Sequence, residues 1–342
     1  MRCYDDLPMK SHQKKLTLFL LALGFCTAAY SQEVVASSCR ENDQIDSSKR
    51  QEVNAAALDF VQTLLGSNPA AAFSSLSEEG KKAVPDEMAL VQAATLIQQF
   101  KPADLKVEHT YVINIFGKSP GRVVCGKSLS KPDEWVSVVA ADLPEQAYVS
   151  LSAEAINNQF AFTVWLVPGA GGWKVQSFSM NMGTLANEGP DQLWERARAQ
   201  KANGHNLNAA LLYFAAMQTI NRGPNLQLGL ADAISKDASE YQLPPEIEGQ
   251  PPFEWKAPDM TFEVLSVGPI AVGGKIYIVI QDESPPWHSN DQIDGWNRKL
   301  IAWFKGRFPE YSDAFAGIVV RANEQGTHRG YGTVDEVSSK AQ

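Results

Sequence analysis

The densest set of side chains able to hold a metal ion lies in an acidic stretch toward the end of the chain. Four of them supply carboxylate oxygens or an imidazole: Asp282, Glu283, His288 and Asp291. Their spacing matches neither a zinc signature nor a calcium loop, each of which places its ligands at fixed intervals. Acids near a helix start also offset the helix dipole without any metal. We therefore expect no metal and no cofactor, and keep these four residues as the alternative ligand set.

The same stretch contains an aromatic residue between prolines and polar side chains. Trp287 follows Pro285 and Pro286 and is followed by His288. A tryptophan with a polar rim is typical of the anchor residues of protein interfaces. We therefore predict that Trp287 and His288 contact a binding partner, while the helix-capping interpretation of this loop stays open.

The N-terminal residues have the pattern of a secretory signal peptide. Three lysines precede an apolar run, and small residues follow at the −3 and −1 positions of a cleavage site: Lys10, Lys14, Lys15, residues 16–29, then Ala29 and Ser31. The run is shorter than the roughly 20 residues that span a bilayer. We expect cleavage before Gln32, a periplasmic or secreted protein, and no stable membrane span after cleavage. An uncleaved N-terminal anchor is the alternative.

Cleavage would leave two of the four cysteines, Cys39 and Cys125. An oxidising compartment would permit one disulfide between them. The alternative is a buried free thiol at Cys125 and a disordered Cys39, because two cysteines do not define a disulfide framework.

The charge balance limits the possible partners. Removal of residues 1–31 takes away four basic and two acidic residues and changes the formal net charge from −9 to −11. Nucleic acids and anionic membranes both require a basic surface, so neither is expected as a partner. The expected partner is an envelope protein or a small apolar ligand.

Periodicity and composition divide the chain into segments. Helical spacing of apolar residues up to about residue 100 gives way to period-two alternation, an order typical of an α+β fold. Within it, residues 107–116 and 122–127 are predicted to pair as a hairpin. The expected segments are the signal peptide at 1–31, a flexible tether at 32–46, an α+β domain at 47–185, a helical bridge at 189–243, a Pro-rich linker at 244–258 and a second α+β domain at 259–337.

The first domain ends in a hairpin with the sequence Phe-Thr-Val-Trp at 162–165 and Gly-Trp-Lys-Val at 172–175. Over about residues 48–182, this hairpin and the order of elements resemble the ketosteroid-isomerase-like superfamily, also called nuclear-transport-factor-two-like. The resemblance implies N-terminal helices packed into a curved sheet around a cone-shaped cavity. The superfamily includes both enzymes and binding modules, so fold alone does not decide function. Trp165 becomes a candidate ligand-contacting residue.

If the strand at 107–115 lines that cavity, it places His109 and Tyr111 about 7 Å apart on one face. An imidazole and a phenol there would serve as proton acceptor and hydrogen-bond donor for an enolising substrate. The isomerases of the superfamily use a carboxylate base, whereas the apolar face at 160–166 contains none. A core histidine bonded to a neighbour is the alternative.

The later segments suggest two further units. Residues 191–221 resemble a single tetratricopeptide-like helix pair, although such repeats need about three copies to stack. The C-terminal segment reads β-β-α-β-β, and we expect its Trp-rich helix to lie on a four-stranded antiparallel sheet.

Together these features predict an exported, non-enzymatic binding or scaffold protein of the cell envelope. The alternative is a cofactor-free isomerase or lyase that uses the cone cavity, with His109 and Tyr111 as its catalytic residues.

Overall fold

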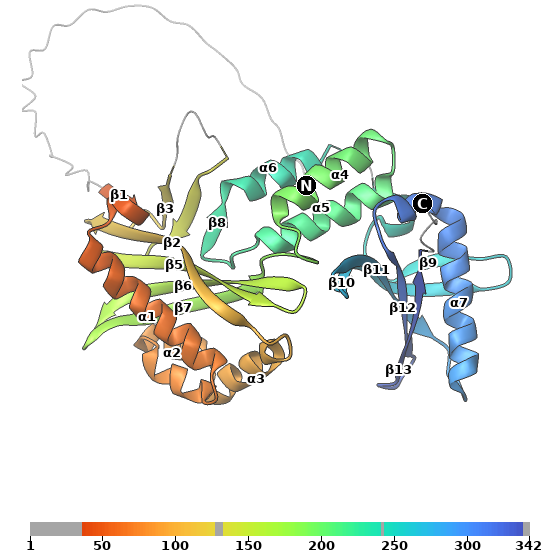
Figure 1. Ribbon diagram of the computed structural model, residues 1–342, viewed down its shortest axis with the longest axis horizontal. Coiled ribbons are helices and arrows are strands. Elements are labelled where there is room, and N and C mark those ends of the chain that lie inside the picture. Colours follow the sequence, from red (N-terminus) through yellow and green to blue (C-terminus); the bar gives the residue numbers. More distant parts are fainter. Residues whose placement is uncertain (1–35, 127–132, 241–242, 338–342) are drawn as a thin grey trace, which may run out of the picture. The chain divides into compact units, whose positions relative to one another are not determined.

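The computed structural model of the protein describes residues 36–126, 133–240 and 243–337, shown as a ribbon in Figure 1. The predicted α+β class is confirmed, since groups of helices alternate with three largely antiparallel sheets. The predicted signal peptide at 1–31 lies outside the described residues. Within those ranges, no helix is both long and apolar enough to cross a membrane.

The first sheet has five strands in the order β1-β2-β5-β6-β7, each antiparallel to its neighbours. The strands are β1 (Ala36–Glu41), β2 (Ala103–Phe116), β5 (Glu145–Ala155), β6 (Asn158–Gly169) and β7 (Gly172–Met182). Glycine at the β6–β7 turn, where Gly171 has a φ of 81°, makes this tight hairpin possible. The predicted hairpin is therefore confirmed.

Helices from the N-terminal part cover one face of this sheet (Figure 1). They are α1 (Ser47–Leu65), the 3-10 turn η2 (Pro69–Ser75), α2 (Glu78–Ala83) and α3 (Glu87–Gln98). Helix α1 begins where the Asp46 carboxylate accepts the backbone N–H groups of Ser48 and Lys49, at 3.0 and 3.2 Å. Its buried side chains recur at helical spacing and face the sheet: Val53, Ala57, Phe60, Val61 and Leu64.

A three-stranded sheet packs on the opposite face of the first sheet. It is formed by β3 (Arg122–Cys125), β4 (Val136–Val139) and β8 (Leu226–Leu228), in the order β3-β4-β8. Its apolar residues share a core with Tyr111, Ile113 and Tyr148. The predicted pairing of 107–116 with 122–127 is wrong. Strands β1 and β5 occupy both edges of β2, so β3 pairs with β4.

The N-terminal segment that was expected to be a flexible tether is ordered over its described part. Residues 36–41 form β1, which pairs with β2 and places Cys39 opposite Ile113. Cys39 is joined to Cys125 of β3 by a disulfide. Pairing with β2 satisfies the backbone N–H and C=O groups of this segment. Its side chains alone predict no regular structure, which is why a flexible tether was predicted.

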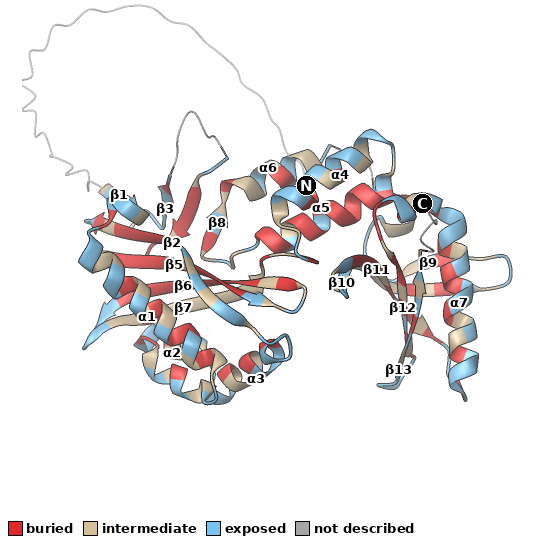
Figure 2. Cartoon of the chain, viewed as in Figure 1, coloured by how far each residue is buried: buried red, intermediate tan, exposed pale blue. Residues whose placement is uncertain are grey.

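Three helices follow the first sheet: α4 (Pro190–Ala202), α5 (Asn206–Ile220) and α6 (Gly229–Ala238). Helix α5 is buried on nearly every side (Figure 2). Its residues share one hydrophobic core with Trp255, Phe262 and Ile278 of the C-terminal sheet. A helix that is apolar all round needs cover on every side. The predicted bridge at 189–243 therefore belongs to the C-terminal core rather than forming a separate connection.

The C-terminal sheet has five strands in the order β13-β12-β11-β10-β9, and helix α7 (Asn290–Arg307) packs on it. The strands are β9 (Phe253–Lys256), β10 (Thr261–Val272), β11 (Lys275–Ser284), β12 (Gly317–Glu324) and β13 (Gly330–Glu336). The expectation of four antiparallel strands is wrong in two respects. The predicted linker supplies β9, and β12 runs parallel to β11 because α7 returns the chain to the end from which β11 began.

Candidate functional site

His109 and Tyr111 do not line the helix-covered face of the first sheet. A bulge in β2 between Val107 and His109 shifts the alternation of its side chains. Val107 and Val112 therefore pack with the helices, while Tyr111 is buried in the core on the other face. Burial, assisted by the Glu41 charge, raises the pKa of Tyr111 to about 12. The expected inward-facing pair is therefore wrong.

His109 itself is exposed at the edge of the fold. Its ring stacks on Tyr111 with 6.2 Å between ring centroids, and its Nδ1 lies 3.4 Å from the Asn42 side-chain nitrogen. No buried polar environment surrounds the imidazole, so this geometry lacks the enclosed base that an enolisation would require.

Aromatic and aliphatic side chains fill the space between the helices and the first sheet. Phe60 of α1 packs edge-on against Phe178 of β7, with 5.0 Å between ring centroids. Phe162 is fully buried beside them, and Phe160 contacts Phe100 at 5.5 Å. This part of the fold is a packed hydrophobic core.

Trp165 lies on the opposite face of the sheet and is 8 % exposed. Its ring stacks on Tyr148 at 5.4 Å, and its indole N–H donates to the Gln146 side-chain oxygen at 3.1 Å. Burial raises the pKa of Tyr148 above its usual range. Because its apolar surface and its donor are both used internally, Trp165 is a core residue and not a surface contact.

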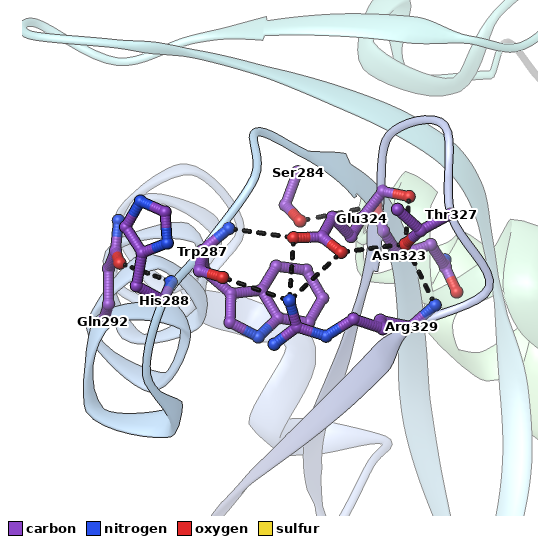
Figure 3. Close-up of polar contacts among 8 residues, drawn as sticks. All are labelled: Ser284, Trp287, His288, Gln292, Asn323, Glu324, Thr327 and Arg329. Carbon is purple, nitrogen blue, oxygen red and sulfur yellow. Dashed lines mark hydrogen bonds and ion pairs between the residues drawn. The ribbon is translucent and has the colours of Figure 1, made fainter.

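Trp287 is also buried, as part of a cluster that joins the β11–α7 loop to the β12–β13 turn (Figure 3). Its backbone N–H donates to the Glu324 carboxylate at 3.0 Å, and its carbonyl accepts from Arg329 at 3.1 Å. The Arg329 guanidinium lies 4.7 Å from the centroid of the Trp287 ring. The prediction of Trp287 as an exposed anchor is wrong, since Arg329 covers it.

Glu324 is the centre of this cluster, which we call the Glu324 clasp (Trp287, Glu324, Thr327 and Arg329). The carboxylate accepts from the Trp287 N–H, from Thr327 at 2.9 Å and from Arg329 at 3.1 Å. The Trp287 N–H is the largest influence holding the pKa of Glu324 below its ordinary value. His288 remains exposed, with its backbone N–H bonded to Gln292 at 3.0 Å.

The four alternative metal ligands are not brought together. Adjacent residues of a strand point to opposite faces, and only Asp282 of the Asp282–Glu283 pair is fully buried. The exposed Asp291 lies in the first turn of α7. Within residues 36–126, 133–240 and 243–337, no group of three or more His, Cys, Asp or Glu side chains is placed to hold a metal ion.

Asp282 has an unusual environment for a carboxyl group. One oxygen accepts the indole N–H of Trp296 at 2.6 Å, and the other, Oδ1, has no hydrogen-bond partner. Burial is the main cause that raises the pKa of Asp282 to about 7. The group is therefore largely neutral below neutral pH, which lowers the cost of burying it.

The cavity that sequence reasoning missed lies where β3 and β8 meet the end of α5. It has a volume of about 280 Å³. The exposed Arg122 and the half-buried Arg222 line it together with apolar side chains, and its lining contains no acidic residue. The two arginines are a hundred positions apart in sequence, so no local motif could have indicated them.

A larger and more polar cavity, of about 780 Å³, lies between the start of α5 and the end of α7. Its arginine, Arg307, forms an ion pair with Glu246 and lies over the Phe308 ring. The arginine of this cavity is thus ion-paired within the chain, in contrast to the two arginines of the smaller cavity.

Comparison with known proteins found no matching family model, no matching curated protein and no matching solved structure.

Proposed function

We propose that this chain is an exported, non-enzymatic binding protein. The observation that carries the proposal is the packed interior of the first domain, in which Phe60, Phe162 and Phe178 occupy the space that an enzyme of the resembled superfamily would keep open. A filled interior supports a scaffold role for this domain. Ligand or partner binding then belongs to its surface cavities.

Export is proposed from the signal-peptide pattern, and the Cys39–Cys125 disulfide supports it because such bonds persist in oxidising compartments. The test is expression of the full chain in a bacterium, with fractionation and N-terminal sequencing. A mature chain that begins at Gln32 in the periplasm or medium is the expected result. Retention of the uncleaved chain in the cytoplasm would contradict export.

The binding role is tested by native mass spectrometry of the mature chain, purified from its own host without detergent. We expect a bound small molecule or a stoichiometric partner. A bare monomer from every preparation would count against the proposal. The cofactor-free enzyme is not carried forward, because it required His109 and Tyr111 inside the cone, and they lie outside it.

A further inference from the structure

We propose that the cavity lined by Arg122 and Arg222 binds a small organic oxyanion, a carboxylate or phosphate ester carried on an apolar body. This inference rests on the proposed binding function and names the ligand class. It is argued from the partners of the two guanidinium groups, from the rigidity of their supports and from the remaining lining of the cavity.

Arg222 follows the last turn of α5. One of its nitrogens, Nη1, donates to the carbonyl oxygens of Thr219 at 2.7 Å and Asn221 at 3.0 Å. Among the described residues it makes no ion pair with a carboxylate. Burial lowers the pKa of Arg222, and Glu108 opposes that shift only through space. Arg222 is half-buried, and because its guanidinium stays charged, an anion beside it would be favoured.

The loop that carries Arg222 is held against the first sheet. The Ser179 hydroxyl donates to the Arg222 carbonyl oxygen at 2.6 Å, and Asn225 donates to the Ser177 hydroxyl at 2.6 Å. Gly223 has a φ of 86° and lies against Ser179, where a side chain would clash. These contacts fix the backbone of the loop before any ligand arrives, which reduces the entropy cost of binding.

Arg122 is held from the other side of the cavity. Its Nε donates to the Ser137 hydroxyl at 2.9 Å, and its Nη2 donates to the Ser137 carbonyl oxygen at 3.0 Å. Its Nη1 has no partner in the part of the chain that the structure describes. Ser137 lies on β4 opposite Gln227 of β8, so the side chain of Arg122 extends across the sheet toward the cavity.

The carboxylates near the cavity have hydrogen-bond donors of their own, and the donor to Asp232 comes from Gln227, a lining residue. Glu108 accepts from the Ser152 hydroxyl, and Asp232 accepts from the Gln227 amide at 2.7 Å. Neither lines the cavity. In a chain of net charge −9, two guanidinium groups without a lining acid are a local reversal of charge.

The rest of the lining defines the body of the ligand. Apolar side chains form much of it: Met217, Ile220, Leu226, Leu228 and Ala231. The volume of about 280 Å³ is slightly below the range typical of ligand cavities, which begins at roughly 300 Å³. Guanidinium groups recognise carboxylate and phosphate oxygens through paired N–H donors. The cavity therefore suits an anion with a compact apolar body, such as an aromatic ring.

A purely structural account is available for Arg222. Basic side chains at a helix C-terminus hydrogen-bond the last carbonyl groups and offset the dipole, as its Nη1 does here. Helix capping by Arg222 does not explain why Arg122 lines the same cavity. Capping alone predicts no saturable binding of an anion, whereas the proposed site predicts it.

The experiment titrates the mature, disulfide-bonded chain with benzoate and phenyl phosphate, against inorganic phosphate and neutral benzamide. Binding is followed calorimetrically and by NMR of ¹³C-methyl methionine. We expect saturable binding of at least one aromatic anion and none of benzamide. The Met217 signal should shift on binding, whereas that of Met88 on α3 should not. The stronger of the two anions distinguishes a carboxylate from a phosphate ester.

Variants test the assignment. Arg122→Gln and Arg222→Lys should each weaken binding at least tenfold, and Arg40→Gln, an exposed control with the same loss of charge as Arg122→Gln, should change it less than twofold. Arg222→Lys keeps a positive charge and a donor for the α5 carbonyl groups, so folding is retained. Equal effects in all three variants, an unshifted Met217 signal or no saturable binding would overturn the inference. If the host-purified chain carries a ligand but the aromatic anions do not bind, only this inference is refuted. If the host-purified chain carries no ligand or partner and the anions do not bind, the binding function is refuted as well.

Discussion

Arg329 and Arg222 are both arginines in loops against a β-sheet, but the chain completes the environment of only one of them. Arg329 has the Glu324 carboxylate, the Trp287 carbonyl and the Trp287 ring as partners. Arg222 has two backbone carbonyl groups and, within the described residues, no ion-paired acid. The Glu324 clasp is therefore self-contained architecture, whereas neither arginine of the Arg122–Arg222 cavity pairs with a carboxylate of the described residues.

Asp282 sharpens this contrast. It is buried with one oxygen unpartnered, yet it can bind a proton and become neutral near neutral pH. An arginine cannot lose its proton in a protein. A buried acid thus becomes neutral by taking a proton from solvent, while the half-buried Arg222 keeps its charge.

The largest effect is expected when the Cys39–Cys125 disulfide, which holds the N-terminal strand β1, is removed. The disulfide closes a separation of 86 residues, so Cys39→Ser with Cys125→Ser should cost about 4 kcal/mol of unfolding free energy. Urea denaturation measures the loss. Hydrogen exchange should show new opening in β1 and β3, while β11 and β12 keep their protection. Unchanged stability would mean that packing alone holds β1.

The second prediction concerns Asp282 and pH. Its pKa is about 7 in the folded state, against 3.8 for an unperturbed aspartate, so the folded protein binds more protons between these values. This contribution is fully present below pH 3.8 and is lost as pH rises through 7, a change of about 3 kcal/mol from pH 4 to 7.

Asp282→Asn should abolish this slope, because the amide cannot titrate and still accepts from Trp296. The measurement is the difference in unfolding free energy between variant and wild type at each pH, in which titrations common to both cancel. Glu263 and Glu283, whose charges also raise the pKa of Asp282, remain in both proteins. Parallel pH profiles would contradict the assignment.

The third prediction breaks the Glu324 clasp. Glu324→Ala leaves the Trp287 N–H and Arg329 without their shared acceptor and should cost about 2 kcal/mol. The matched control is Glu254→Ala, which removes an exposed pair with Lys256 and should cost under about 0.5 kcal/mol. Chemical denaturation compares the two, and equal losses would show that the clasp is only a surface pair.

The smallest expected effect is the most informative. Arg122→Met removes a guanidinium that has no acid partner among the described residues and should change unfolding free energy by less than about 1 kcal/mol in either direction. Thermal unfolding with and without phenyl phosphate measures it. A large destabilisation without any ligand would show that Arg122, like Arg329, is structural.

Sequence patterns predicted the elements whose evidence is local. The Gly-rich turn between β6 and β7 and the apolar spacing of α1 depend on neighbours within a few residues. Aromatic residues were predicted less well. Trp165 and Trp287 are apolar enough to bind a partner or to fill a core, and only the surrounding chain decides between the two.

Local sequence patterns are sufficient for the α+β class and the β6–β7 hairpin, because turn chemistry and hydrophobic period act over short distances. The tertiary structure alone decided the face of His109, since one bulge in β2 reverses the alternation. The tertiary structure also decided that β3 pairs with β4, that residues 36–41 of the predicted tether form a strand, and that Arg122 and Arg222 line one cavity. Each of these depends on contacts between residues far apart in the chain, whose formation no local preference encodes.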